Sequence, residues 1–402
     1  MSEEREVQPI TRSCSEERPK CRLCVRRNVS CEYPDQLPRA STNSPSASKA
    51  HLADSPALSY SPSQQSEPTP NTAPLLCLYP SSTETLKLSN LRLLHHWTVS
   101  TSLAMSQYPK DCYIWQTVLP QIGFQYSFVL HAVLSLAALH IAYHDTPETK
   151  SMWMEGIDYH SKSVLGFQKE VAHITDESSE ALFMWSLCNL IYTFATSNPL
   201  RQGPDATNSS GSSTQYDKLL GAEWIPMMRG VTAILEPTHN SLRFGRMNTM
   251  MSLGNWDELD PDKGDQDPED IQFCGTRETW KSSEKAHVYE DVLQTLRRCR
   301  LYSAQFRQMD AETLENWGYN KEFSAPLTWI NLAPEAYFSL LQQRQPPALI
   351  LFSFFGAMLH RLNHYWFMEG WGKATVEAIA DILGSYWRPW ISWPLRVIHD
   401  SE

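Results

Sequence analysis

The sequence predicts an all-α protein, in which a helical bundle follows a disordered linker and a short cysteine-rich segment. Three observations lead to this fold class. Apolar residues recur at helical spacing through most of the chain beyond about residue 84. The sequence contains no alternating apolar–polar run of strand length, no internal repeat and no coiled-coil heptad. Its 14 Trp, 16 Tyr and 14 Phe supply enough large side chains for a sizeable core.

The expected helices follow one another along the second part of the chain. The first has Ser82 or Thr83 as its N-cap, and its apolar positions are Leu86, Leu88, Leu91, Leu93, Leu94 and Trp97. Segment 128–143 is apolar nearly all round, which indicates a helix in the centre of a bundle. Further helices are expected at 148–173, at 178–195 with Asp176 as a cap, at 221–235, at 285–309 and, as a pair, within 347–383.

Composition divides the chain into three parts. Residues 1–34 are charged and rich in cysteine, residues 35–82 form a Ser/Pro-rich linker, and residues 83–402 form the helical domain. The linker buries too little apolar surface to offset its ordering entropy, so we expect it to be disordered. Disordered insertions are also expected near 197–215, which is polar, and 254–270, which holds eight acids against one lysine. The Ser-Pro steps of the linker suit either a plain spacer or phosphorylation sites.

Charge is unevenly distributed between these parts. The formal net charge is −11, and residues 1–82 are neutral with nine basic and nine acidic residues, so the helical domain carries all of it. An acidic body is a poor surface for nucleic acid, because phosphate contacts need Lys and Arg. The segment 14–31 is the exception, with five basic residues against two acids. Any contact with DNA is therefore expected there.

Targeting and membrane signals are absent from the sequence given. Its first residues hold no apolar signal segment, and the apolar runs 128–143 and 348–359 are shorter than the about 20 residues that cross a bilayer. We therefore expect an intracellular protein, in which disulfides are rare. The scattered cysteines are then interpreted as core-filling thiols; they are Cys77, Cys112, Cys188, Cys274 and Cys299.

Four cysteines at the N-terminus have metal-ligand spacing. They are Cys14, Cys21, Cys24 and Cys31, in the pattern C-x6-C-x2-C-x6-C. A C-x2-C pair lets two thiolates reach one tetrahedral zinc ion at about 2.3 Å. The same segment supplies cations expected to contact DNA phosphates, namely Lys20, Arg22, Arg26 and Arg27. Because such modules fold on binding metal, the segment is expected to be disordered without zinc.

The segment CSEERPKCRLCVRRNVSCEYP resembles the second half of the fungal binuclear zinc cluster (Zn2Cys6). The resemblance implies that Cys14, Cys21, Cys24 and Cys31 are the third to sixth cysteines of that motif. The first half, with its own C-x2-C pair and basic helix, is not present before Cys14. Two explanations are open. If an upstream exon is absent from this sequence, the complete module would bind two zinc ions. Alternatively, the module is truncated and binds one zinc ion or none.

The helical domain resembles the regulatory domain of the sterol uptake control protein family. The resemblance lies in LLHHWTVSTSLAMS (93–106), in segment 114–144 and in segment 359–395. It implies a helical domain that binds a hydrophobic ligand, such as a sterol, near its C-terminal end. Trp366, Gly370 and Trp371 are the candidate ligand residues, although these aromatic side chains are also suited to the core.

No catalytic motif supports an enzyme. The pairs His95–His96, His140–His144 and His360–His364 have no third metal ligand at a predictable position. Gly-rich phosphate loops are absent, and the acidic segment lacks the glycine that an EF-hand needs.

Together these features predict a nuclear transcription regulator that shuttles from the cytoplasm, with DNA, zinc and a sterol-like ligand as partners. Its target genes would be sterol or secondary-metabolite genes, and a homodimer is an open alternative to a monomer. The competing hypothesis is a ligand-sensing or interaction protein, derived from such a regulator, that no longer binds DNA.

Overall fold

Helices and the turns that connect them make up the described part of the protein. The computed structural model describes residues 88–400, except 107, 109–111, 201–211, 264–266 and 320–323. Within these ranges no residue lies in a β-strand, which confirms the predicted all-α fold. Both the cysteine segment and the linker lie outside the described residues. The expected insertion at 197–215 is described only at its ends, and helix α8 begins there, at Ser212.

The first half of the domain contains α2 (Leu88–His96), α4 (Leu119–Gln125), α5 (Ser127–Tyr143), α6 (Thr149–Glu170), α7 (Asp176–Thr196), α8 (Ser212–Leu219), α9 (Trp224–Leu235), α10 (His239–Phe244) and α11 (Asn248–Met251). The second half contains α12 (Pro268–Gly275), α13 (Ala286–Gln305), α14 (Ala311–Asn316), α15 (Ser324–Leu332), α16 (Glu335–Gln342), α17 (Pro346–His360), α18 (Trp371–Trp387) and α19 (Ser392–His399). Helix α2 continues through a π-helical turn, Trp97–Thr101, into a 3-10 turn, Ser102–Met105.

Helix α5 is the centre of the first half, as its sequence predicts. It is enclosed by α2, α4, α6 and α7, and its residues from Phe128 to Ala142 are almost all buried. Two glycines of α6 allow the closest approach. A Cβ atom at Gly166 would lie 2.4 Å from the Cβ atom of Phe128, and one at Gly156 would lie 3.0 Å from the Leu139 side chain. Any larger residue at Gly166 would therefore force α5 and α6 apart.

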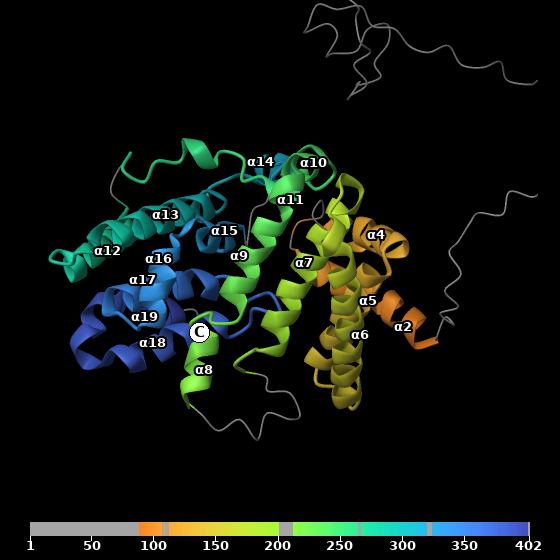
Figure 1. Ribbon diagram of the computed structural model, residues 1–402. Helices are drawn as coiled ribbons and strands as arrows, with labels where there is room; N and C mark the ends of the chain where they lie inside the picture. The colour runs from red at the N-terminus through yellow and green to blue at the C-terminus, as the bar shows by residue number, and fades with distance from the viewer. Residues whose placement is uncertain are drawn as a thin grey trace, which may run out of the picture. The chain divides into compact units, whose positions relative to one another are not determined.

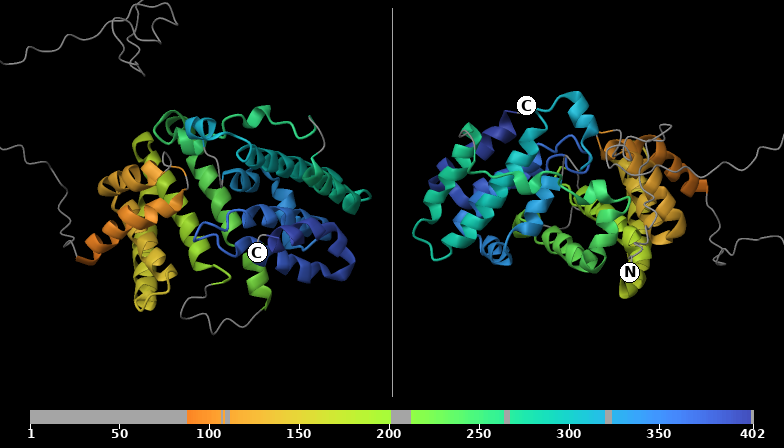
Figure 2. Two further views of the ribbon diagram at one scale, coloured as in Figure 1. Left: turned by 180° about the vertical axis from the view of Figure 1, so that it is seen from behind. Right: turned by 90° about the horizontal axis from the view of Figure 1, so that it is seen from above.

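Helix α17 is the central, enclosed helix of the second half, as α5 is of the first. Every residue from Ala348 to His360 is buried, among α13, α15, α16, α18 and α19. Gly372 of α18 faces it so closely that a Cβ atom there would lie 2.3 Å from the backbone nitrogen of His360. Figures 1 and 2 show α5 and α6 at one side of the body and α17 to α19 at the other, with α7 and α9 between.

Helix α7 begins at Asp176, but its N-cap is the preceding residue rather than Asp176 itself. The Thr175 side chain accepts a hydrogen bond from the backbone N–H of Ser178, and the Ser178 side chain accepts one from the backbone N–H of Thr175. This reciprocal capping box satisfies two donors that a helix N-terminus otherwise leaves unpaired. Asp176 instead accepts a hydrogen bond from Ser241 and sits in the first turn, where a negative charge is favourable.

The acidic segment 254–270 differs from the disordered insertion that its composition predicts. Its described residues lie against two buried arginines of α13 and run into α12 at Pro268. Arg297 donates to Asp270 at 2.7 Å and to Asp262 at 2.6 Å. Arg300 pairs with Asp267, and its second terminal nitrogen lies 3.5 Å from Asp270. The acids are needed because two buried guanidinium groups require counter-charges.

The directions of the pKa shifts of Asp270 and Arg297 agree with this pairing. Burial by itself would raise the pKa of Asp270, but hydrogen bonds and charge from Arg297, together with the charge of Arg300, outweigh burial and lower the pKa. The pKa of Arg297 is raised by its hydrogen bond to Asp270. Both groups are therefore charged across the physiological range, and the segment is fixed to α13 by ion pairs.

Two further expectations concern the cysteines and the membrane. Cys188 and Cys299 are buried free thiols, whereas Cys112 and Cys274 are half-buried, and Cys77 lies outside the described residues. Among the described helices, none is both long enough and apolar enough to span a bilayer.

We expect Asp270→Asn to lower the free energy of unfolding by about 3 kcal/mol, because the neutral amide leaves buried Arg297 without its main counter-charge. Urea denaturation followed by circular dichroism measures the change. The matched control is Asp158→Asn, which breaks an exposed ion pair with Lys162 one helical turn away. It should cost less than about 0.5 kcal/mol. Equal effects of the two substitutions would contradict a stabilising role for the network.

Candidate ligand site

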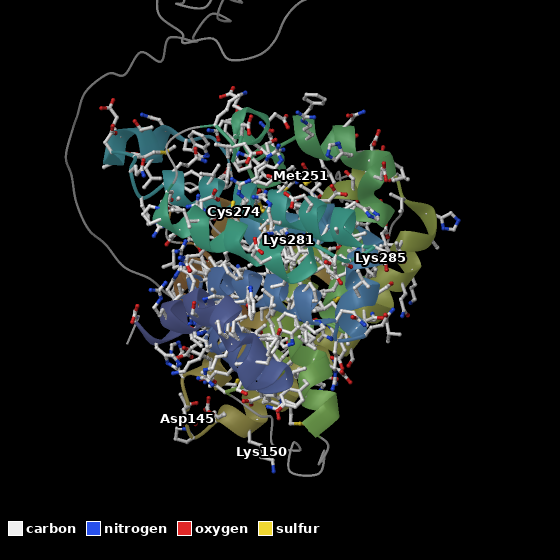
Figure 3. The ribbon with its side chains drawn as sticks, turned by 90° about the vertical axis from the view of Figure 1, so that its left-hand side faces the viewer. Asp145, Lys150, Met251, Cys274, Lys281 and Lys285 are labelled. Atoms are coloured by element: carbon white, nitrogen blue, oxygen red, sulfur yellow. The ribbon has the colours of Figure 1, made fainter. Side chains whose placement is uncertain are left out.

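A partly open pocket lies where the C-terminal end of α5 meets α6, the end of α7 and the turn before α18. Its volume is about 720 Å³, within the range of small-molecule sites. Its apolar wall consists of Leu139, Ala142, Trp153, Ala195, Leu200 and Trp366. Its polar lining includes Tyr143, Asp145, Thr149, Lys150, Asn198 and Glu369. Figure 3 shows Asp145 and Lys150 at one edge of the body, away from Cys274 and Lys285.

Hydrogen bonds among the polar lining residues connect the two halves of the domain. The Tyr143 hydroxyl of α5 donates to the Glu369 carboxylate at 2.7 Å. The Asn198 amide, just after α7, donates to the backbone carbonyl of Glu369 at 2.9 Å and accepts from the backbone N–H of Leu200 at 2.8 Å. The turn before α18 is thereby joined to both α5 and α7, and these bonds fix the shape of the pocket.

The three predicted ligand residues have different positions in this arrangement. Trp366 lines the pocket. Gly370 supports its wall: its φ is +77°, and a Cβ atom there would lie 2.3 Å from a methyl carbon of Leu200. Trp371 faces the core instead, where its indole N–H donates to the backbone carbonyl of Phe194 at 3.0 Å. Of the three predicted residues, only Trp366 lines the cavity, and their role in ligand binding stays a prediction.

The other aromatic residues near the C-terminus are spread over separate places. Trp393 packs between Phe273 and Phe354, with ring centroids 5.0 and 5.1 Å away. The rings of Trp387 and Trp390 contact each other near the end of α18, with their centroids 5.4 Å apart. None of these three Trp side chains lines the pocket.

A group of histidines lies directly behind Trp366. The His140 ring centroid is 5.1 Å from that of Trp366, 4.7 Å from that of His144 and 5.4 Å from that of His96. The His140 Nδ1 atom is hydrogen-bonded to the Thr101 hydroxyl at 3.1 Å. Burial, together with the nearby His144 and His96, lowers the pKa of His140 to about 3. The imidazole is therefore neutral and acts as part of the core.

In the described ranges, no set of three or more His, Cys, Asp or Glu side chains is placed to hold an ion. Cys14, Cys21, Cys24 and Cys31, with the basic residues Lys20, Arg22, Arg26 and Arg27, all lie outside the described residues. Their roles in binding zinc and DNA stay predictions.

Residues 92–249, from α2 to α11, match the model of the fungal specific transcription factor domain. A Zn(2)-C6 fungal-type transcription factor of Gibberella zeae is 26% identical over 79% of this chain and 64% of its own length. Another, of Aspergillus fumigatus, is 26% identical over 57% of this chain and 52% of its own length. Residues 92–249 are therefore similar to the fungal specific transcription factor domain, and two of the relatives that match the chain are transcription factors by name.

Sterol uptake control protein 2 of Saccharomyces cerevisiae is also similar, at 25% identity over 49% of this chain and 20% of that protein. The chain thus spans between one fifth and two thirds of the length of these relatives. The pocket combines residues from inside the matched domain, such as Ala195, with Trp366 and Glu369 from beyond it.

Sequence reasoning missed the polar lining residues Tyr143, Asn198 and Glu369. Glu369 stands out only as the one acid in the aromatic segment 365–372. Its partner Tyr143 is 226 positions away in the chain, so no local pattern pairs them.

We expect acid to destabilise the domain through His140. Its folded pKa of about 3 lies below the about 6.5 of an exposed histidine, so below pH 6.5 only the unfolded chain takes up the proton. The contribution of neutral His140 to the free energy of unfolding is present above pH 6.5 and is lost as the pH falls towards 3. Between pH 7 and pH 5 the loss from this group is about 2 kcal/mol.

Urea denaturation of the wild type, His140→Asn and Thr101→Val at the two pH values measures this effect. His140→Asn should remove most of the pH-dependent loss, whereas Thr101→Val keeps the imidazole and should retain the loss. An asparagine variant as sensitive to acid as the wild type would assign the loss to other groups.

Proposed function

We propose that this protein is a transcription regulator whose helical domain binds an apolar small molecule in the pocket beside Trp366. The observation that carries the proposal is the pocket itself, in a domain of the fungal specific transcription factor family. A cavity of about 720 Å³ that combines an apolar wall with a polar edge suits a ligand of sterol size that carries a polar group. The target genes would be sterol or secondary-metabolite genes.

The lining restricts the chemistry of the ligand. Its charged groups are the carboxylates of Asp145 and Glu369 and the ammonium of Lys150. Because acids outnumber the base, an anionic head group would meet net repulsion. An uncharged hydroxyl can instead hydrogen-bond with Asn198 or the Tyr143–Glu369 pair at the pocket surface. The proposed ligand is therefore a neutral, rigid, apolar molecule with a hydroxyl group.

DNA binding is assigned to the segment 14–31. Two of the similar proteins are Zn(2)-C6 factors by name, and this segment holds four cysteines at metal-ligand spacing with a local excess of basic residues. We propose that Cys14, Cys21, Cys24 and Cys31 bind zinc, and that the neighbouring Lys and Arg residues contact phosphates. Function in the nucleus follows from this role. The alternative is a ligand-sensing or interaction protein, derived from such a regulator, that does not bind DNA.

Zinc content of the full chain, measured by native mass spectrometry, decides between these two functions. The proposal expects at least one zinc ion and DNA binding that weakens steeply with salt. Arg26→Ala combined with Arg27→Ala should weaken DNA binding and reduce the salt dependence, while Arg388→Ala on the helical body should do neither. A chain without zinc whose DNA binding is insensitive to the double substitution would support the alternative.

Binding of the fluorescent sterol dehydroergosterol tests the pocket. We expect saturable binding by the full chain, weakened at least about tenfold by Ala195→Phe, which places a ring in the cavity and so costs more than about 1.4 kcal/mol of binding free energy. The control Leu165→Phe adds a ring on the exposed face of α6 and should leave affinity unchanged. If both variants bind as the wild type does, the sterol occupies another site.

A further inference from the structure

A second cavity lies between α8, α9 and α16, and it shares no lining residue with the pocket beside Trp366. Its volume is about 480 Å³, within the range of small-molecule sites. Its floor is apolar and consists of the buried side chains Leu220, Ile225, Phe338 and Leu341. In Figure 1, α9 runs through the middle of the body and α8 lies at its lower end.

Hydrogen-bond acceptors stand at the rim of this second cavity. They are the carboxylates of Asp217 on α8 and Glu335 on α16, which are both exposed. One oxygen of each carboxylate is in an ion pair, 3.1 Å from Arg344 for Asp217 and 3.3 Å from Arg229 for Glu335. Among the described residues, no donor contacts the second oxygen of either carboxylate. These two oxygens are therefore open to a ligand.

Arg229 is the one basic residue among the described residues that line the cavity, and its terminal nitrogens are in use. Its Nη1 atom donates to the backbone carbonyls of Ile330 and Ala333, both at 2.8 Å, and its Nη2 atom pairs with Glu335. The guanidinium also lies over the Phe338 ring, 5.0 Å from the ring centroid. An anionic ligand would have to break the bonds that close the end of α15.

Arg344 joins the two sides of the cavity. It follows the C-terminal end of α16 with a φ of +55°, in the left-handed region that favours glycine. Its side chain reaches Asp217 on α8. A glycine would suit the backbone at this position better but would leave α8 and α16 unconnected here, so the ion pair is the feature that this strained residue provides.

Two helix ends add negative potential to the site. Helix α8 ends at Leu219 and α16 ends at Gln342, and both ends adjoin lining residues of the cavity. The C-terminal end of a helix carries a partial negative charge, which favours a cation near its last turn. Residues 83–402, with their net charge of −11, attract cations over a longer range.

We propose that this cavity is a second ligand site, and that it binds an organic amine with a protonated amino group on an apolar chain or ring. An ammonium group has donors and no acceptor, which matches the open carboxylate oxygens of Asp217 and Glu335. The apolar part of the ligand would cover the floor of the cavity and leave water. The site thus differs in chemistry from the pocket beside Trp366, for which a neutral ligand is proposed.

Fluorescence titration of the full chain with dansylcadaverine, a primary amine joined to a naphthalene ring, tests the proposal. We expect saturable binding, and at least about tenfold weaker binding of N-pentyl dansylamide, which has the same ring and chain without the amine. Asp217→Asn combined with Glu335→Gln keeps the shape of the rim but removes its charge. The double substitution should reduce the preference for the amine to less than about threefold.

The outcomes against the proposal are definite. Equal affinities of the wild type for the two probes would overturn it, because apolar contact alone would then explain binding. A preference for the amine that the double substitution leaves intact would overturn it too, because other acids would hold the ammonium group.

Two matched substitutions locate the site. Ala222 is exposed and lines the cavity, so Ala222→Trp should fill it and weaken dansylcadaverine binding at least about tenfold. Ala336 is exposed on α16 beside Glu335 but does not line the cavity, so Ala336→Trp is the control and should leave affinity unchanged. Circular dichroism verifies that both variants are folded. Unchanged binding by folded Ala222→Trp would refute a site in this cavity.

Ala195→Phe, in the pocket beside Trp366, separates the two sites. It should leave dansylcadaverine binding unchanged, and Ala222→Trp should leave dehydroergosterol binding unchanged. If Ala195→Phe removed amine binding, the amine would occupy the first pocket and the second site would be refuted. Failure of sterol binding in the wild type would contradict the proposed function alone, since the amine is measured independently.

Discussion

Enclosure of helix α5 is the constraint on which the rest of the structure depends. A helix that is apolar nearly all round is stable in water only when other helices cover every side, and α2, α4, α6 and α7 do this. Glycines at 156 and 166 bring α6 into direct contact with α5. The pocket lies at the C-terminal end of α5, where its last turn presents Ala142 and Tyr143 to a cavity instead of a neighbouring helix.

The sequence was sufficient to predict the long helices because their apolar patterns are local. Segments 128–143 and 347–359 are so apolar that burial follows directly, and the structure buries both. Composition was a poorer guide for the acidic segment 254–270. Eight acids predict solvation, but the acids alone do not reveal that Arg297 and Arg300 of α13 are buried and need them. Electrostatic partners distant in sequence decide that case.

The pocket also depends on residues that are distant in sequence, which local sequence patterns cannot pair. An aromatic turn near the C-terminus was identifiable, and Trp366 does line the cavity. Trp371 has the same chemistry five residues later but faces Phe194, and Gly370, which lies between the two Trp residues, has a positive φ. A list of aromatic residues does not distinguish these two orientations. The hydrogen bonds among Tyr143, Asn198 and Glu369, which define the polar edge, depend entirely on the tertiary fold.

The short turn between α5 and α6 has a consequence for the order of folding. These two helices are neighbours in sequence, so the loop that closes between them costs little entropy, and their pairing is favoured early. Contacts between Tyr143 and Glu369 close a loop of 226 residues and are favoured only afterwards. On a ribosome, the α5–α6 hairpin can therefore form while the cavity is still missing one wall. The cavity is complete only when the last part of the chain has been synthesised.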